Sequence, residues 1–334
     1  MLDTSGIDTI MTHDAAFKRI PDVKVVDPHT LVIRASVIIA PLQPSRVAGM
    51  SERGPIRIGI AKVGNIGTSV LLDILLDERA EREDIVVRVV GSGPKLTPEE
   101  VREVVSKLLE FKPDLVLVAS PNAALPGPSA AREMLAEAGV PTIVITDSPG
   151  KKAVKDVEAK GMGYIIVPAD SMIGARREFL DPTEMAIYNA DLVKVLACTG
   201  VFHALVEALD RVIAALKAGE GPELPRLILD RDKAVEAARF ANPYARAKAM
   251  AAYEMAAKVA DLTVEGCFKV KEWERYTHIV AAAHELMREA ARLADEAREM
   301  EKQGDTVFRA PHNRKGVLLR KEKLIEKPRK PEGA

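Results

Sequence analysis

The chain has 334 residues, of which 47% are hydrophobic and 29% are charged, and its formal net charge is −1. This length suffices for about two domains of ordinary size, and the composition is that of a globular protein. The balanced charge and an aromatic content of only 4% exclude a basic nucleic-acid surface and an extended platform for stacking bases.

The chain has two cysteines, Cys198 and Cys267, which excludes a disulfide scaffold and indicates a reducing, cytoplasmic setting. The six histidines are scattered, with no H-E-x-x-H and no C-x-x-C, so we expect no metal site. The sequence has no apolar run long enough to span a bilayer. Its N-terminal segment lacks the basic start and long apolar centre of a signal peptide. We therefore expect neither a membrane partner nor a nucleic-acid partner.

Residues 1–54 are predicted to be an N-terminal extension. Segments 23–26 and 31–39 have the composition of strands, and residues 27–30 are typical of a turn between them. Residues 50–55 lead into the next strand in the way that many chains begin. Our hypothesis is that the functional protein starts near Met50. Mass spectrometry of the native N-terminus tests it, because residues before Met50 would contradict a misassigned start.

From residue 56 to about residue 170, apolar segments of strand length alternate with segments of helical pattern. Strands are predicted at 56–61, 85–90, 115–119, 142–145 and 164–167, with helices between them. One of these helices begins with Thr97-Pro98-Glu99-Glu100, a capping box with proline at the first helical position. The alternation predicts an α/β domain at 55–178, with a mainly parallel sheet and helices on both faces.

The turn after the first strand reads Lys62-Val63-Gly64-Asn65-Ile66-Gly67-Thr68-Ser69 and leads into an apolar helix. Such a turn presents backbone N–H groups at a positive helix N-terminus, which suits an anionic ligand. We expect Thr68 or Ser69 to cap the helix. The turn departs from the dinucleotide fingerprint G-x-G-x-x-G, because Lys62 replaces the first glycine and no acidic residue ends the second strand. An ordinary tight turn of an α/β sheet explains the two glycines as well.

In a parallel sheet with right-handed crossovers, the loops that follow the strands lie at one edge. Here these loops are 62–69, 91–95, 120–122, 146–149 and 168–171, and all are small, polar or rigid. Their Ser, Thr and Asn side chains supply hydrogen bonds, and Lys62 and Lys95 supply positive charge. Turn and cap chemistry accounts for most residues of this kind in loops. The prediction of a ligand site therefore concerns the edge as a whole.

The second half is predicted to form a helical bundle domain at 179–303. Asp181-Pro182-Thr183-Glu184 is another capping box, and the alanine-rich pattern after it continues to residue 218 with a break near Gly200. A linker covers 219–225, and helices are predicted at 231–241, 243–262 and 271–302. Alanine-rich helices approach one another closely.

The last part of the chain, 304–334, is predicted to form a β-hairpin and a basic tail. Two short apolar segments, 306–309 and 316–320, lie on either side of a turn at 311–313.

From about residue 55 onward the chain resembles the coenzyme F420-dependent methylene-tetrahydromethanopterin dehydrogenases of archaea. The first fifty-odd residues have no counterpart in that family. The stretches that carry the resemblance are Ile58-Gly59-Ile60-Ala61-Lys62-Val63-Gly64-Asn65-Ile66-Gly67-Thr68-Ser69, Leu75-Leu76-Asp77-Glu78-Arg79-Ala80, Arg88-Val89-Val90-Gly91-Ser92-Gly93, Thr146-Asp147-Ser148-Pro149, Ala310-Pro311-His312 and Glu326-Lys327-Pro328.

The resemblance implies an oxidoreductase of methanogenesis and one-carbon metabolism. Members of the family transfer a hydride reversibly between 5,10-methylenetetrahydromethanopterin and the deazaflavin coenzyme F420. The products are the 5,10-methenyl cation and the reduced coenzyme. Coenzyme F420 is a dissociable co-substrate, and the family uses no flavin and no metal. The family assembles as a homohexamer built from dimers, so the resemblance implies a homo-oligomer.

The chemistry implied by the resemblance requires orientation more than acid–base groups. A carboxylate near the developing cation would help electrostatically, and the candidates are Asp147 and Asp170, although either residue serves equally well as a helix cap or turn residue. Coenzyme binding is assigned to Lys62, Gly64, Asn65, Ile66, Gly67, Thr68, Ser69, Ser92 and Gly93. Binding of the pterin is assigned to Ser120, Pro121, Asn122, Thr146, Asp147 and Ser148.

Two other functions stay open on the sequence alone. One is an NAD(P)-dependent oxidoreductase with a divergent glycine turn, which binding of NADP or NAD would reveal. The other is a non-catalytic protein that binds the pterin or the deazaflavin without turnover, which the sparse acid–base inventory favours.

Overall fold

The computed structural model describes residues 9–11, 24–26, 54–76, 81–171 and 181–330. The chain divides into two compact units, residues 1–51 and residues 52–334. In the first unit β1 (Thr9–Met11) pairs in parallel with β2 (Lys24–Val26). The expected partner of residues 23–26 was the segment 31–39, which lies outside the described residues. The partner that the structure describes for this strand is β1.

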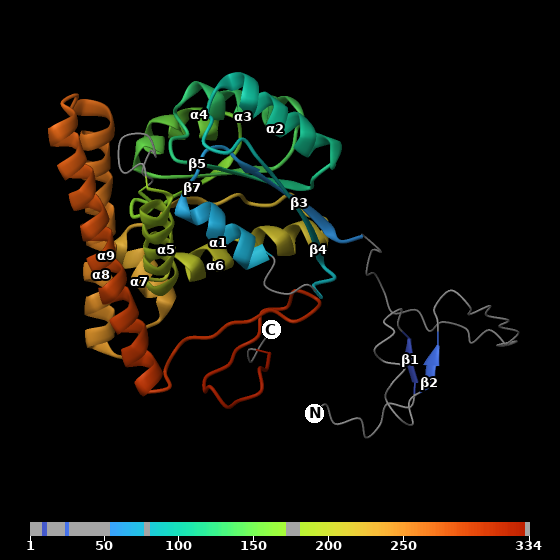
Figure 1. Cartoon of the computed structure of the whole chain (residues 1–334). Coiled ribbons are helices and arrows are strands. Elements are labelled where there is room, and N and C mark those ends of the chain that lie inside the picture. Colours follow the sequence, from blue (N-terminus) through green and yellow to red (C-terminus); the bar gives the residue numbers. More distant parts are fainter. Residues whose placement is uncertain (1–8, 12–23, 27–53, 77–80, 172–180, 331–334) are drawn as a thin grey trace, which may run out of the picture. The chain divides into compact units, whose positions relative to one another are not determined.

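The second unit is built on a six-stranded sheet in which neighbouring strands are parallel (Figure 1). The strands lie in the order β4-β3-β5-β6-β7-β8. Their bounds are β3 (Ile56–Lys62), β4 (Ile85–Gly91), β5 (Leu115–Ser120), β6 (Thr142–Thr146), β7 (Gly163–Ile166) and β8 (Arg226–Ile228). This sheet confirms the predicted fold. The sequence does not predict β8, because its three residues follow the expected linker without a clear strand pattern.

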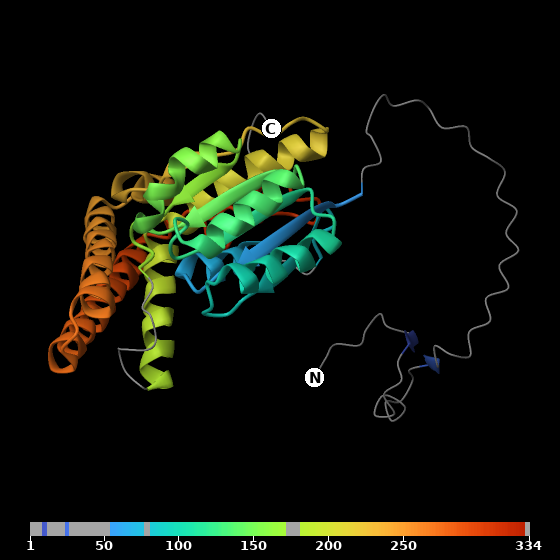
Figure 2. The ribbon, with the colours of Figure 1, turned by 90° about the horizontal axis from the view of Figure 1, so that it is seen from above.

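Helices cover both faces of the sheet (Figures 1 and 2). On one face lie α2 (Pro98–Glu110), α3 (Pro126–Glu137) and α4 (Val154–Ala159), and on the other lie α1 (Gly67–Leu76), α5 (Pro182–Cys198) and α6 (Val201–Ala218). The side chains of β5 alternate between two cores. Leu115 and Leu117 join the core of α1, α5 and α6, whereas Val116 and Val118 join the core of α2, α3 and α4. A strand that is covered on both faces requires this uninterrupted apolar run.

The helical part continues with α7 (Arg231–Ala238), α8 (Pro243–Val264), the π-helical turn η4 (Glu265–Lys269) and α9 (Trp273–Gln303). The alanines Ala249, Ala252 and Ala256 of α8 are fully buried, as are Ala283 and Ala290 of α9. Small side chains let these two helices pack closely along their length (Figure 1), as the sequence predicts. The proposed subdivision of the second unit at residues 178 and 303 stays a prediction.

The break predicted near Gly200 is the corner between α5 and α6. Gly200 has a φ of 105°, and a Cβ atom on it would lie 1.9 Å from the carbonyl oxygen of Ala234. Glycine is required here, because it adopts this φ without strain and has no Cβ atom to clash with that oxygen. Among the described helices, no single one has the length and apolar composition to cross a bilayer, and α5 with α6, bent by 65°, meets that test only as a pair.

The tail reverses direction as predicted, with antiparallel bridges between Arg309 and Lys321 and between His312 and Leu318. The turn differs from the expected 311–313: the N–H of Gly316 donates to the carbonyl of Asn313 at 3.0 Å. The side chain of Asn313 accepts hydrogen bonds from the N–H groups of Lys315 and Val317, which is the Asx geometry that suits such a turn.

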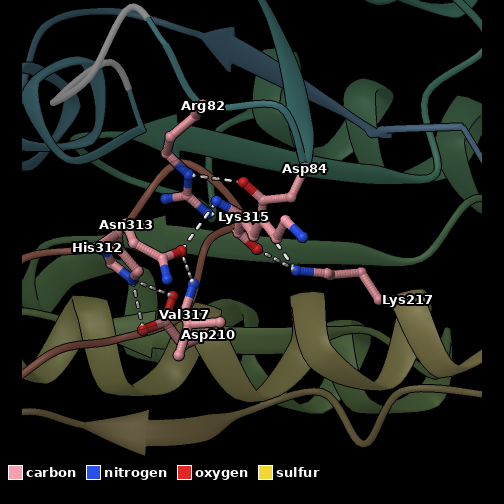
Figure 3. Close-up of polar contacts among 8 residues, drawn as sticks. All are labelled: Arg82, Asp84, Asp210, Lys217, His312, Asn313, Lys315 and Val317. Carbon is pink, nitrogen blue, oxygen red and sulfur yellow. Dashed lines mark hydrogen bonds and ion pairs between the residues drawn. The ribbon is translucent and has the colours of Figure 1, made fainter. Parts of the chain in front are cut away.

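This turn is fastened to α6 and to the start of β4 by a polar cluster that we call the tail clasp (Figure 3). The carboxylate of Asp84 binds Arg82 at 2.9 Å and Lys217 at 3.2 Å. Lys217 also donates to the carbonyl of Lys315 at 3.0 Å. The ring of His312 is buried, and its Nε2 lies 2.8 Å from Asp210. The clasp therefore joins the tail to Asp210 and Lys217 of α6, which precede their tail partners by 102 and 98 residues, and through Lys217 to Asp84.

Candidate functional site

The strand order places a topological switch point between β3 and β5. The chain continues from β3 to β4 on one side and then returns to β5 on the other side of β3. The helices that follow β3 and β5 lie on opposite faces of the sheet (Figure 1). Ligands of open parallel sheets bind in the crevice at this point. The loops that frame it contain predicted site residues: 62–69 follow β3, and 120–122 follow β5.

The loop after β3 touches the loops on both of its sides. Gly64 has a φ of 78°, and a Cβ atom on it would lie 3.0 Å from Leu96 and from Pro121. The N–H of Ser92 donates to the carbonyl of Lys62 at 3.0 Å. The structure therefore brings 62–69, 92–93 and 120–122 together, and Gly64 is required for both its conformation and its close packing.

These residues differ in how far they are exposed to a ligand. Asn65 and Gly93 are exposed, and Lys62, Ser92, Pro121 and Asn122 are half-buried. Gly64, Ile66, Gly67, Thr68 and Ser69 are buried. The ammonium group of Lys62 lies 2.8 Å from the carboxylate of Asp73 on α1, which fixes the lysine beside the loop.

The N-terminus of α1 is capped by Asp170. The sequence proposes this residue as a carboxylate near the developing cation. Its carboxylate accepts hydrogen bonds from the N–H of Gly67 at 2.7 Å and from the N–H of Thr68 at 2.8 Å. The hydroxyl of Thr68 donates to it as well. The expectation that Thr68 or Ser69 caps this helix is wrong, because both residues lie inside its first turn. Burial raises the pKa of Asp170 to about 6, although the hydrogen bonds from Thr68 and Gly67 oppose the rise.

Asp147 follows β6 and caps the 3-10 helix η3 (Ser148–Ala153), since its carboxylate accepts the N–H of Ser148. The residue is 6% exposed. Burial raises its pKa to about 8, with the charge of Asp170 adding to the rise and the N–H of Ser148 and the charge of Lys151 opposing it. Because β6 pairs with β7, the two carboxyl groups lie near enough to influence each other's charge.

Three of the residues assigned to the pterin hold the loops themselves. The hydroxyl of Ser120 accepts the N–H of Asn122 at 3.3 Å, and the side chain of Asn122 accepts the N–H of Ala124 at 3.0 Å. The hydroxyl of Thr146, which is 1% exposed, accepts the N–H of Ala123 at 3.1 Å. Asn122 and Ser148 remain partly accessible.

Helices of the second half also reach this edge, and the sequence does not identify them as part of it. Tyr253 of α8 donates its hydroxyl to the carbonyl of Leu229 after β8. Tyr188 of α5 donates to the carbonyl of Ser171 at 2.7 Å, and its ring lies 4.7 Å from that of His284. The signal in the sequence was a tyrosine within an apolar helical pattern. When such a residue is buried, its hydroxyl needs a hydrogen-bond partner from another segment.

Cavities also occur away from this edge. One of about 120 Å³ lies between α6, the end of α7 and the tail, lined among others by His203, Arg239 and Phe308. Its lining contains none of the predicted site residues. No group of three His, Cys, Asp or Glu side chains within the described residues is placed to hold a metal ion.

The family model described as methylene-5,6,7,8-tetrahydromethanopterin dehydrogenase matches residues 56–329. The F420-dependent methylenetetrahydromethanopterin dehydrogenase of Archaeoglobus fulgidus is 60% identical over 273 residues, which are 82% of this chain and 99% of that protein. The protein of the same name from Methanothermobacter marburgensis is 55% identical over the same shares.

A solved structure of an F420 dependent methylene-tetrahydromethanopterin dehydrogenase, in complex with methylene-tetrahydromethanopterin and coenzyme F420, is similar to this chain with a TM-score of 0.79. It is 53% identical, and the match covers 82% of this chain and 99% of that chain. The match thus covers 99% of each of these relatives. The chain belongs to the methylene-5,6,7,8-tetrahydromethanopterin dehydrogenase family.

Proposed function

We propose that this protein transfers a hydride reversibly between 5,10-methylenetetrahydromethanopterin and coenzyme F420, yielding the 5,10-methenyl compound and the reduced coenzyme. The observation that carries the proposal is the solved relative that holds both molecules, at 53% identity over 99% of its length. The deazaflavin ring, when bound, supplies the hydride acceptor.

The accessible residues at the switch point fit an anionic coenzyme. Lys62 supplies a positive charge, and Ser92, Gly93 and Asn65 supply exposed or half-exposed polar groups and backbone. The buried members of the assigned set, Gly64, Ile66, Gly67, Thr68 and Ser69, give the loop its shape. The exposed residues of the loop are thus assigned to contacts with the coenzyme, and the buried residues are assigned to keeping the loop rigid.

The pterin is assigned to the neighbouring loops after β5 and β6. Pro121, Asn122 and Ser148 are the partly accessible residues there, and Ser120 and Thr146 support them. Asp147 is the carboxyl group that can respond to charge in the substrate, because it is held by a single N–H hydrogen bond within a buried setting. A nearby positive charge favours its ionised form and is stabilised by it.

The experiment is the visible absorbance of oxidised coenzyme F420 mixed with the purified protein and methylenetetrahydromethanopterin. We expect bleaching that requires both the protein and the pterin. Reduction of NADP in place of coenzyme F420 would support a nicotinamide enzyme, and binding of both ligands without bleaching would support a non-catalytic protein. A matched pair of variants locates the site. Gly64→Ala adds a methyl group at a φ of 78°, 3.0 Å from Leu96 and Pro121, whereas Gly161→Ala adds the same group at a φ of 68° in open space. Only Gly64→Ala should lower the activity.

We also propose a cytoplasmic homohexamer. Cys198 and Cys267 form no disulfide with each other, which suits a reducing compartment. Phe268 of η4 is 79% exposed and Trp273, the first residue of α9, is 64% exposed. Exposed aromatic side chains of this size favour burial between subunits. Light scattering during size-exclusion chromatography tests the proposal, and a monomer at micromolar concentration would contradict it.

A further inference from the structure

The N-terminus of α1 is already occupied by a charge that belongs to the protein. Asp170 is completely buried, and each of its carboxylate oxygens accepts a backbone N–H of the first turn, from Gly67 at 2.7 Å and from Thr68 at 2.8 Å. The next N–H, that of Ser69, donates to the carbonyl of Ile66 at 3.1 Å. The first-turn donors that would normally bind an anionic ligand are therefore satisfied internally.

The same place is also closed sterically. A Cβ atom on Gly67 would lie 2.9 Å from Leu196 and 3.0 Å from Leu192, both on α5, and 3.0 Å from the Asp170 carboxylate. In folds that bind dinucleotides, the pyrophosphate lies against this first turn after the glycine loop. Here a second anion would meet a negative charge, first-turn N–H groups that already have partners, and the side chains of another helix.

We propose that Asp170 is a positioning residue that takes the place of a bound phosphate at α1. The carboxylate holds the loop after β3 in its binding geometry before any ligand arrives. The phosphodiester of the coenzyme then lies away from the N-terminus of α1, toward Lys62 and Ser92, and nicotinamide dinucleotides are rejected. This inference rests on the proposed function for the identity of the coenzyme, but the internal anion can be tested without turnover.

The first test removes the carboxylate and returns it as a free ion. In Asp170→Ala, formate at 100 mM should raise the midpoint of thermal unfolding by about 2 °C or more, and chloride at equal ionic strength should not. Asp230→Ala is the matched control, because Asp230 caps α7 through the N–H of Lys233 at 3.0 Å but lies outside the proposed site. Formate should leave the unfolding midpoint of that variant unchanged. An equal formate effect on both variants would overturn the proposal.

The second test uses kinetics to separate positioning from general stability. Asp170→Ala should raise the KM for coenzyme F420 at least tenfold while kcat changes less than threefold, and formate should lower that KM again. A KM equal to that of the wild type would overturn the positioning role. If the wild-type protein shows no F420-dependent turnover, the proposed function fails, and the formate experiment still decides whether Asp170 acts as an internal anion.

The third test addresses the rejection of dinucleotides. ADP, which carries the pyrophosphate without a nicotinamide, should not compete with coenzyme F420 for the wild-type protein at millimolar concentration. Competition by ADP at that concentration would overturn the rejection of dinucleotides.

Asp170→Asn covers the case in which the alanine variant does not fold. The carboxamide fills the same space but has one acceptor oxygen in place of two, so it can satisfy only part of the first turn. We expect an intermediate rise in the KM for coenzyme F420 and no rescue by formate, because no room remains for the ion. A KM equal to that of the wild type in this variant would also overturn the proposal.

Discussion

Asp147 and Asp170 lie at the ends of neighbouring strands, yet their carboxyl groups have different partners. Asp170 accepts two backbone N–H groups and a hydroxyl, whereas Asp147 accepts the N–H of Ser148. This difference explains why burial raises the pKa of Asp147 to about 8 but that of Asp170 only to about 6. Hydrogen bonds to the ionised form offset the cost of burying a charge.

The raised pKa of Asp147 predicts how stability changes with pH. Between its ordinary pKa of 3.8 and the folded value of about 8, the folded protein keeps a proton that the unfolded chain has released. Raising the pH through this range therefore lowers the free energy of unfolding, by up to about 1.4 kcal/mol per pH unit from this group, and the loss levels off above pH 8. Urea unfolding between pH 5 and pH 9 measures the slope.

Asp147→Asn should flatten that slope, because the amide does not titrate. Asp181→Asn is the control: Asp181 also caps a helix, through the N–H of Thr183, but it is exposed at the surface. Its slope should equal that of the wild type. Identical slopes in the wild type and Asp147→Asn would show that Asp147 is ionised in the folded protein.

The ion pair between Lys62 and Asp73 allows a test of the coenzyme site. Lys62→Ala should raise the KM for coenzyme F420 several-fold with little change in kcat, because the lost charge contributes to binding rather than to the chemical step. Asp73→Asn removes the partner but leaves the ammonium group, so the KM should stay the same or fall. Equal increases in both variants would mean that the ion pair acts only by shaping α1.

At the scale of elements, the corner between α5 and α6 depends on one glycine. Gly200→Ala places a methyl group 1.9 Å from the carbonyl oxygen of Ala234, at a φ of 105°. We expect a loss of about 2 kcal/mol or more in the free energy of unfolding, measured in urea. Gly139→Ala is the matched control, because its φ is also positive, 65°, but its Cβ would meet open space. A similar loss in both variants would attribute the effect to backbone strain alone.

The sequence predicts most elements because their signals are local. The apolar runs of β3, β5 and β6 and the capping boxes before α2 and α5 need no knowledge of the rest of the chain. The cap of α1 could not be predicted in this way, since Asp170 acts on residues that precede it by 102 and 103 positions. The same limit applies to Tyr253 and Tyr188, whose partners are backbone carbonyls of other segments.

At the scale of the whole molecule, the tail clasp predicts energetic coupling between distant parts of the chain. A double-mutant cycle of His312→Ala and Asp210→Asn should give a coupling energy of about 1–3 kcal/mol, since the histidine ring is buried. The exposed pair Lys107 and Glu110 should give less than about 1 kcal/mol. Urea unfolding of the single and double variants provides the measurement. Equal coupling energies for the two pairs would indicate that the tail adds nothing beyond a surface contact.

The reversal of the tail was predictable from its turn residues, but its docking was not. Gly316 illustrates the reason: a Cβ atom on it would lie 1.9 Å from the carboxylate of Asp84, a residue of the first strand connection. Nothing near Gly316 in the sequence specifies that neighbour. Composition and local pattern thus define the elements, whereas the fit between the tail and the sheet emerges only when the whole chain has folded.

The clasp has a consequence for the order of events during synthesis. A nascent chain emerges from its N-terminal end, and domains form as their residues become available. Asp84, Asp210 and Lys217 leave the ribosome long before His312 and Lys315, which lie in the last part of the chain. Until the tail has emerged, Asp210 of α6 lacks its partner His312, whereas Lys217 can already bind Asp84. Emergence of the tail is therefore the step that completes this cluster, and a chain that stops before His312 leaves the cluster incomplete.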